Sequence, residues 1–464
     1  MSESHAKFVE GSLLKHIVVM SMTSSVGIMA IFAADLVDLI FISMLGNVAL
    51  AAAVGYAGTA LFFTNSISIA LSIAGGVLVA KSLGADDEED ARSKANAVSG
   101  IGIGLSILVA GGVYAFAEQI IASLGATGET LAQAVSYLRI VVLSMPIMAI
   151  AMHANALLRA HGDAKRAMYS TLAGAFVNAA LDPIFIFVLG LDIKGAAMAT
   201  VAARVTILIT SVWPVIRYYN GMSLPSPSQI HTHFKTVLAI MLPAILTNVA
   251  TPIGMAIVTR SMAKYGTDAV AGMAIIGRLT PVAFAVVFAL SGAIGPIVGQ
   301  NVGAKRYDRV KTAVLDAVKF VTIYVIVMTV VLYLLRPYIA AVFEADGIAL
   351  ELLYLFCGPL ALAYIFNGMI FVGNASFNNL GKPSYASWIN WGRNTVGTYP
   401  FVLIGAYFWG AEGVLIGQAV GGIMFAFLGL WLVTELIDSN VDPEHEPFGH
   451  ALRDHINAWR GRCH

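Results

Sequence analysis

Long apolar runs recur along this chain from end to end, and they limit its possible folds more than any other feature. Each run is about 20 residues long, the length that an α-helix needs to cross the hydrocarbon core of a bilayer at about 1.5 Å per residue. Only 12% of the 464 residues are charged, whereas soluble domains carry about 25%. The chain is therefore predicted to be an all-α polytopic membrane protein.

Twelve of these runs are predicted to span the membrane, six in each half of the chain. They cover residues 17–45, 50–82, 95–117, 132–158, 167–190, 195–218, 237–263, 269–300, 312–342, 348–377, 385–409 and 413–437. The predicted organisation is an N-terminal segment, a six-helix lobe, a linker, a second six-helix lobe and a tail, over residues 1–16, 17–218, 219–236, 237–437 and 438–464. The linker is inferred from its Pro, Ser and Gly content.

The second half repeats short motifs of the first at an offset of about 219 residues. Gly84-Ala85 recurs as Gly303-Ala304, and Gly162 recurs as Gly381. Because each half has an even number of spans, the halves are parallel repeats related by a pseudo-two-fold axis along the membrane normal. The cavity between such halves is where transporters bind their cargo.

Basic residues gather in the connections that follow the even-numbered runs. They are Lys81, Arg92, Lys94, Arg159, Lys165, Arg166, Arg217, Lys235, Lys305, Arg306, Arg309, Lys311 and Lys382. By the positive-inside rule these connections, and therefore both termini, are expected to be cytoplasmic. The polar N-terminus has no cleavable signal, so we expect a multi-pass protein of the cell inner membrane.

Two aspartates, Asp35 and Asp38, interrupt the first apolar run and, three residues apart, share one helix face. An acidic side chain inside the bilayer costs about 3 kcal/mol even on lenient insertion scales, and such residues commonly mark ion or proton pathways. Val258 and Phe401 stand near the positions that the repeat makes equivalent to Asp38 and Asp182. Since the second half keeps the scaffold without these charges, the aspartates are expected to be functional.

Polar residues of the fifth and sixth runs reach the depth of Asp38. Counting the helical rise from the outer end of each run places Asp182 and Thr200 level with Asp38, in the outer third of the membrane. One helical turn deeper lie three more polar residues, Asp35, Asn178 and Arg204. Carboxylate, amide and hydroxyl oxygens that meet at one level suit either a small hard cation such as sodium or a protonatable carboxylate. The residues leave this choice open.

The candidate ion-coupling residues are Asp38, Asp182, Asn178, Thr200 and Asp35, of which the first four would also be the metal ligands if the ion is sodium. For Asp35 a second interpretation is an ion pair with Arg204, because a buried Arg also needs a partner. Pro183 follows Asp182 directly. Because proline removes a backbone donor and disfavours helical geometry in the preceding residue, Pro183 is predicted to act as a hinge.

Several functional classes lack support in the residues. The formal net charge of zero gives no electrostatic footprint for nucleic acid, and two cysteines are too few for a disulfide framework. No HExxH, GxSxG or GxxxxGK[ST] motif occurs, so neither an enzyme nor an ATP-driven pump is expected. Nor do the runs show the repeated polar lining of a channel. His153 is expected to be solvated at a span end, and Arg393 is expected to snorkel to water.

The order of the motifs resembles that of the multidrug and toxic compound extrusion (MATE) family. They are Leu36-Val37-Asp38, Leu45-Gly46, Gly84-Ala85, Tyr137-Leu138-Arg139 and Arg159-Ala160-His161-Gly162-Asp163. The resemblance implies a secondary antiporter that exports organic, often cationic, compounds in exchange for sodium ions or protons, with no other cofactor. It covers nearly the whole chain and implies a small-molecule substrate, a lipid environment and a monomer.

Within that family the sequence is most similar to the DinF-like branch. The resemblance implies that Asp38, Asn178, Asp182 and Thr200 form the coupling site of the first lobe. The other main bacterial branch also has acidic residues on spans 7 and 10, where this chain has Thr251 and Asn367. The alternative function is a flippase for lipids or lipid-linked oligosaccharides, from the same wider superfamily. Such a flippase would need several cationic residues for a pyrophosphate, and Arg204 is a single candidate.

Overall fold

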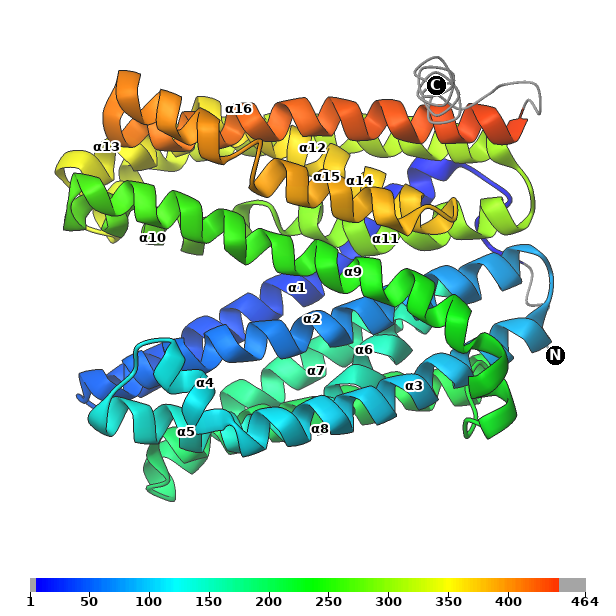
Figure 1. Cartoon of the computed structure of the whole chain (residues 1–464), viewed down its shortest axis with the longest axis horizontal. Coiled ribbons are helices and arrows are strands. Elements are labelled where there is room, and N and C mark those ends of the chain that lie inside the picture. Colours follow the sequence, from blue (N-terminus) through cyan, green and yellow to red (C-terminus); the bar gives the residue numbers. More distant parts are fainter. Residues whose placement is uncertain (1–5, 442–464) are drawn as a thin grey trace, which may run out of the picture.

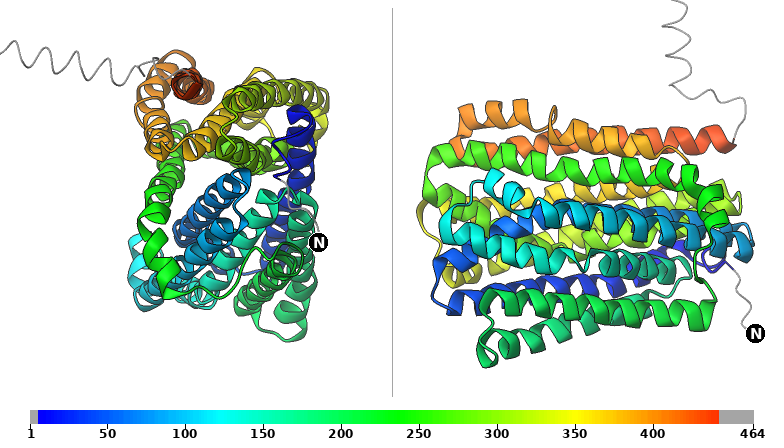
Figure 2. Two further views of the ribbon diagram at one scale, coloured as in Figure 1. Left: turned by 90° about the vertical axis from the view of Figure 1, so that its right-hand side faces the viewer. Right: turned by 60° about the horizontal axis from the view of Figure 1, so that its bottom comes forward.

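The computed structural model describes residues 6–441, which are helical throughout and contain no strand. The helices form two bundles side by side (Figure 1), and the end-on view of Figure 2 shows the two groups separately. The first lobe comprises α1 (Leu13–Met44), α2 (Val48–Gly84), α3 (Glu88–Ala115), α4 (Ala117–Ser123), α5 (Gly128–Val142), α6 (Met145–Ala160), α7 (Ala164–Pro183), the π-helix η1 (Ile184–Val188) and α8 (Asp192–Tyr219).

The second lobe repeats this order of helices. It comprises α9 (Pro227–Met262), the short η2 (Ala263–Tyr265), α10 (Thr267–Ala283), α11 (Ala285–Gly303), α12 (Tyr307–Val342), α13 (Gly347–Phe356), the short η3 (Pro359–Leu362), α14 (Ala363–Asn379), α15 (Pro383–Asn394) and α16 (Tyr399–Val441). We call the end where α2 meets α3, α8 meets α9 and α11 meets α12 the linker end, at the right in Figure 1. The opposite end is the far end.

The described helices account for the twelve predicted spans. Ten are long and apolar enough to cross a membrane, and α5 with α6, bent by 50°, makes an eleventh. The tenth helical segment, Pro383–Val441, contains two spans, because non-helical backbone at Trp409 and Gly410 interrupts α16. This brings the number of spans in the described residues to twelve. Beyond this break the chain folds back on itself, and Gly405 and Gly413 lie so close that a Cβ on either would overlap the carbonyl of the other. The predicted fold class is confirmed.

The two lobes meet at the linker end through glycines that the repeat makes equivalent. A Cβ on Gly84, the last residue of α2, would overlap the backbone carbonyl of Gln300 in α11. A Cβ on Gly303, the last residue of α11, would overlap the carbonyl of Lys81 in α2. The same sequence position in each half therefore contacts the other half, as a two-fold relation requires.

The segment before α1 also joins the two lobes at the linker end. Phe8 is buried, and its N–H donates to Gln300 Oε1 at 2.7 Å. Gln300 Nε2 in turn donates to the carbonyl of Ala160 in α6, at 2.8 Å. The carbonyl of Phe8 accepts from Asn301 Nδ2 and from Arg309 Nη2, each at 3.1 Å. The Lys7 ammonium donates to the carbonyl of Gly162 in the first lobe at 3.0 Å, so one short segment contacts both lobes.

The predicted linker, residues 219–236, is partly helical. Helix α8 includes Tyr219, and α9 already begins at Pro227, so residues 227–236 are helical. The start of α9 is a capping box in which Ser226 Oγ accepts from the Gln229 N–H and the Gln229 side chain accepts from the Ser226 N–H. Of the predicted tail, residues 438–441 continue α16, and the remainder lies outside the described residues, as do residues 1–5 of the N-terminal segment.

The glycine contact between the lobes yields a stability prediction. We expect Gly84→Val to lower the melting temperature of the purified protein, because the side chain would displace α11 at a cost of about 1–3 kcal/mol for overpacking. Gly104→Val is the matched control, since Gly104 lies within a helix but has open space around it. Equal melting temperatures for the two variants, measured by differential scanning fluorimetry, would contradict this account of the contact.

Candidate functional site

Asp38 and Asp182 lie next to each other inside the first lobe. Asp38 comes from α1 and Asp182 from the last turn of α7, and the two carboxyl groups are close enough to interact electrostatically. Asp182 is fully buried, and Asp38 Oδ1 is buried without a hydrogen-bond partner. Two carboxyl groups this close do not both stay charged unless a proton or a cation compensates. The pair can therefore bind one or the other.

Asn178 and Thr200 complete the group that the depth comparison predicted. Asn178 is buried one turn before Asp182 in α7, and its Nδ2 lies 3.4 Å from each carboxylate oxygen of Asp182. The Thr200 hydroxyl donates to the carbonyl of Ala196 within α8, at 3.1 Å. Three helices thus supply the side chains of this group, which we call the carboxyl site.

Tyr137 belongs to the carboxyl site and was missed as a site residue in the sequence. It is buried in α5, near Thr200, and lies within electrostatic range of Asp38 and Arg204. The available signal was its place at the start of Tyr137-Leu138-Arg139 in an apolar run. A buried tyrosine hydroxyl usually needs a partner, and the sequence offered polar groups at matching depth.

Arg204 does not form the ion pair with Asp35 that the sequence left open. Its buried guanidinium donates from Nη1 to the carbonyl of Val141 at 3.2 Å and to the Ser144 hydroxyl at 3.0 Å. These two acceptors flank the break between α5 and α6, where the span bends by 50°. A break frees backbone carbonyls, and Arg204 compensates for it. Asp35 remains exposed, one turn from Asp38.

The backbone changes geometry directly after Pro183. Helix α7 ends at Pro183 and continues as the π-helix Ile184–Val188, whose last N–H bond runs from Leu189 to the carbonyl of Ile184 at 2.9 Å. Asp182 itself is helical, so the irregularity lies after the proline rather than before it. Single-turn π segments interrupt helices most often at functional sites. The wider turn begins one residue after the buried carboxylate.

The second lobe has a buried cation rather than buried acids. Arg393 of α15 donates from Nη1 to Asn367 Oδ1 at 2.6 Å, and its Nε is buried without a partner. The prediction that Arg393 snorkels to water is therefore wrong, because the side chain turns to α14. His153 is likewise buried rather than solvated, with Nε2 3.1 Å from the carbonyl of Ala95.

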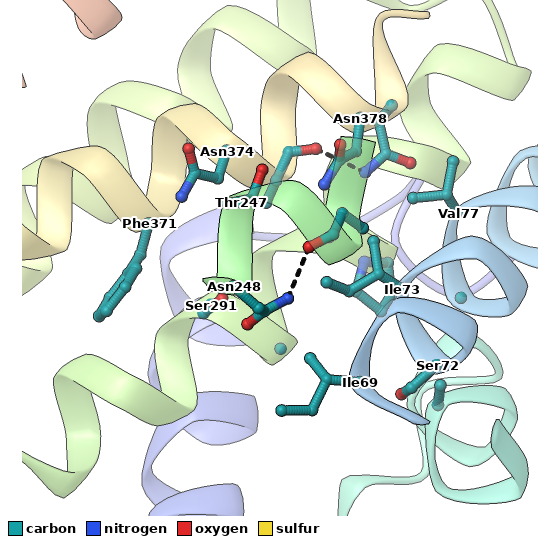
Figure 3. Close-up of a pocket in the computed structure, with 18 of the residues that line it drawn as sticks. Ile69, Ser72, Ile73, Val77, Thr247, Asn248, Ser291, Phe371, Asn374 and Asn378 are labelled. Carbon is teal, nitrogen blue, oxygen red and sulfur yellow. Dashed lines mark hydrogen bonds between the residues drawn. The ribbon is translucent and has the colours of Figure 1, made fainter. Parts of the chain in front are cut away.

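A separate cavity of about 190 Å³ lies between the lobes. Residues of α2 and α6 line it from the first lobe, and residues of α9, α11, α14 and α15 line it from the second. Figure 3 shows Ile69, Ile73 and Val77 of α2 opposite Thr247 of α9 and Asn374 of α14. None of the predicted coupling residues lines this cavity.

The architecture is that of a two-lobed membrane transporter, with a carboxyl site inside one lobe and a polar cavity between the lobes. The MatE family model matches residues 23–184 and again residues 243–404. The same model thus matches each half once, which confirms the internal repeat. The chain belongs to the MatE family, as the resemblance in the sequence indicated.

Relatives and solved structures of this family align over nearly the whole chain. It is 27% identical to an FAD transporter of Shewanella oneidensis over 90% of this chain and 94% of the relative. It is 25% identical to the multidrug export protein MepA of Staphylococcus haemolyticus, over 92% of this chain and 95% of the relative. The crystal structure of the Vibrio cholerae MATE transporter VcmN superposes with a TM-score of 0.87 at 26% identity, covering 92% of this chain and 97% of that one.

The position of Arg204 yields a prediction about stability. We expect Arg204→Leu to lower the melting temperature, because two hydrogen bonds from a charged group, to the Val141 carbonyl and to the Ser144 hydroxyl, are lost, at a cost of about 1.5–3 kcal/mol each. Asp35→Asn is expected to leave it unchanged. If Asp35→Asn destabilises the purified protein as much as Arg204→Leu does, the two residues act as an ion pair after all.

Proposed function

We propose that this protein is a secondary antiporter that exports organic compounds in exchange for protons or sodium ions. The observation that carries the proposal is the pair of neighbouring carboxyl groups, a half-buried Asp38 whose buried Oδ1 has no partner and a fully buried Asp182. A buried pair of this kind is expensive to maintain, which is why intramembrane carboxylates usually carry protons or ions. Related proteins named as an FAD transporter and as multidrug exporters make an organic cargo the natural choice.

Binding at the carboxyl site changes both charge and shape. A proton or cation removes the repulsion between Asp38 and Asp182 and lets α1 and α7 approach. The adjoining π-helix gives α7 a place to adjust after Pro183. The ion drives the cycle only to the extent that it binds the outward-open and inward-open states with different affinity.

The carboxyl site can accept either a proton or a sodium ion, but the two require different rearrangements of its side chains. Asp38, Asp182, Asn178, Thr200 and Tyr137 offer oxygen atoms of the kind that hard cations prefer. The Asn178 amide, however, turns its nitrogen rather than its oxygen to Asp182. A sodium ion would require this amide to turn over, whereas a proton on either carboxyl group would not. The arrangement seen here therefore favours the proton.

The orientation follows from the charge of the connections. With the basic connections inside, the linker end and both termini are cytoplasmic and the protein sits in the cell inner membrane. A monomer surrounded by lipid suffices, since the cargo cavity and the carboxyl site both lie within one chain. For the alternative flippase, Arg159 is the one cationic residue that lines the cavity, fewer than a pyrophosphate requires.

Ion coupling is tested with Asp38→Asn and Asp182→Asn. Both variants are expected to fold normally and to lose at least about 90% of gradient-driven efflux, because neither amide can exchange a proton or pair with a cation as a carboxylate does. Purified protein in proteoliposomes, with a proton gradient and a sodium gradient imposed separately, measures the effect. The exposed Asp192→Asn serves as the control. Undiminished gradient-driven efflux by Asp38→Asn refutes the coupling role.

The hinge is tested with Pro183→Ala. Alanine restores a backbone donor and permits a regular α-helix where the π-helix begins. We expect slower transport, by about threefold or more, with unchanged binding of the ion, because the substitution alters the transition between states and not the carboxyl site. Transport rates in proteoliposomes and ion-dependent tryptophan fluorescence separate the two effects. Weakened ion binding at an unchanged rate is the result that contradicts a hinge.

A further inference from the structure

The cavity between the lobes is polar and has no acidic side chain. Its lining includes five asparagines, Asn248, Asn374, Asn378, Asn379 and Asn390. Threonine and serine hydroxyls add to them, and Figure 3 shows Thr247, Ser72 and Ser291 around the space. Among the residues that line this cavity, the only charged one is Arg159. The charge of the cavity is therefore positive.

Arg159 reaches the cavity from the last turn of α6. Its side chain crosses to the second lobe and lies against Gly292 of α11, where a Cβ would be 3.5 Å from Arg159 Nε. The sequence had placed Arg159 among the basic residues of a cytoplasmic connection. Three ion pairs in the described part of the chain involve Asp90, Asp163 and Asp438, and none of them includes Arg159. A guanidinium with no counter-ion in a cavity is a site for an anion.

Two asparagines of the lining also lack partners. Asn378 is 7% exposed and Asn379 is 0% exposed, and the Oδ1 atom of each is buried without a hydrogen bond. In contrast, Asn374 and Asn390 pair across α14 and α15, with the Asn390 amide donating to Asn374 Oδ1 at 2.9 Å. Buried polar atoms are nearly always paired, so the free amide oxygens are available to a ligand with N–H or O–H donors.

We propose that this cavity binds organic cargo that carries a phosphate or carboxylate group, with Arg159 holding the anionic group. Asn378 and Asn379 accept hydrogen bonds from donors on the same cargo. The inference rests on the proposed transport function, since it makes the cavity the cargo site. It reverses the expectation of a cationic cargo that came with the family resemblance, because a cation here would meet Arg159 and no carboxylate.

The size of the cavity limits what it holds in this state. A volume of about 190 Å³ is below the roughly 300–1,000 Å³ of typical ligand sites. The cavity therefore accommodates the anionic group and its neighbouring atoms, and the rest of a larger cargo extends between the lobes. Arg393 does not line the cavity, since its guanidinium is held by Asn367. Arg393 is the natural control residue.

The test compares probes that differ in charge on a shared ring system. Flavin mononucleotide is paired with riboflavin, and fluorescein with the cationic dye rhodamine 110. Binding to the purified full-length protein, followed by fluorescence polarisation, is expected to favour the anionic member of each pair by at least about tenfold. Arg159→Gln is expected to abolish that preference, Arg159→Lys to retain part of it, and Arg393→Gln to leave it intact. A preference for rhodamine 110, or no preference in either pair, overturns the proposal.

A variant that adds a negative charge to the cavity separates a binding role of its residues from a structural one. Asn378→Asp adds an acid to the same cavity and is expected to weaken anionic probes and strengthen rhodamine 110, with an unchanged melting temperature. A purely structural role of the cavity residues would weaken all probes alike, and that result refutes the proposal.

Failure of the inference is distinguishable from failure of the antiport function. Binding that depends on Arg159 in Asp38→Asn protein supports the anion site whether or not ions drive transport. Gradient-driven efflux of rhodamine 110 that Arg159→Gln leaves unchanged supports antiport and overturns the anion site.

Discussion

The hydrocarbon core of a membrane offers no hydrogen-bond partners, and the structure depends on this constraint throughout. It allows only helices and closed β-barrels, which pair their backbone groups internally, and the described part of this chain is built from helices. Where a span breaks, a polar side chain compensates, as Arg204 does for the carbonyl of Val141. Against this background the unpaired groups stand out. Some of these groups, such as Arg393 Nε, lie elsewhere, but Asp38 Oδ1, the free amide oxygens of Asn378 and Asn379, and the guanidinium of Arg159 lie at the two places where an ion or a cargo could pair with them.

The two halves share the same arrangement of helices, but they do not share the same buried charged residues. Gly84 and Gly303 correspond because they meet near the axis that relates the lobes, where neither helix has room for a Cβ. The buried charges obey no such symmetry, since the first lobe has Asp38 and Asp182 and the second has Arg393. Helix packing thus constrains the same sequence positions in both halves, whereas the proposed ion site needs residues from only one half. In the proposed mechanism this asymmetry lets one lobe respond to an ion while the other completes the cavity.

The membrane spans and the internal repeat were predictable from the length and spacing of the apolar runs. The meeting of Asp38 with Asp182 was predictable because the rise of a helix per residue is constant. The partners of Arg204 and the burial of His153 were not, because depth along a span says nothing about which neighbour a side chain faces. Tyr137 was missed for a related reason, since an aromatic residue in an apolar run usually indicates packing. The start of α9 within the predicted linker was not predictable, because Ser226 and Pro227 suit a loop and equally well the start of a helix.

The carboxyl site and the cavity are separate, and α6 reaches both. At its start, the break after Val142 is held by Arg204, next to Tyr137, which interacts with Thr200 and Asp38. At its end, Arg159 lines the cavity. The 16 residues of α6 form a rod of about 24 Å that is too short to bend appreciably. Tyr137 lies in α5, across the 50° bend from this rod, so in the proposed mechanism a movement at the carboxyl site reaches Arg159 through Arg204, whose guanidinium bonds Ser144 at the start of α6. Ion binding can then lower the affinity for cargo without any contact between the two ligands, which is what an exchange mechanism requires.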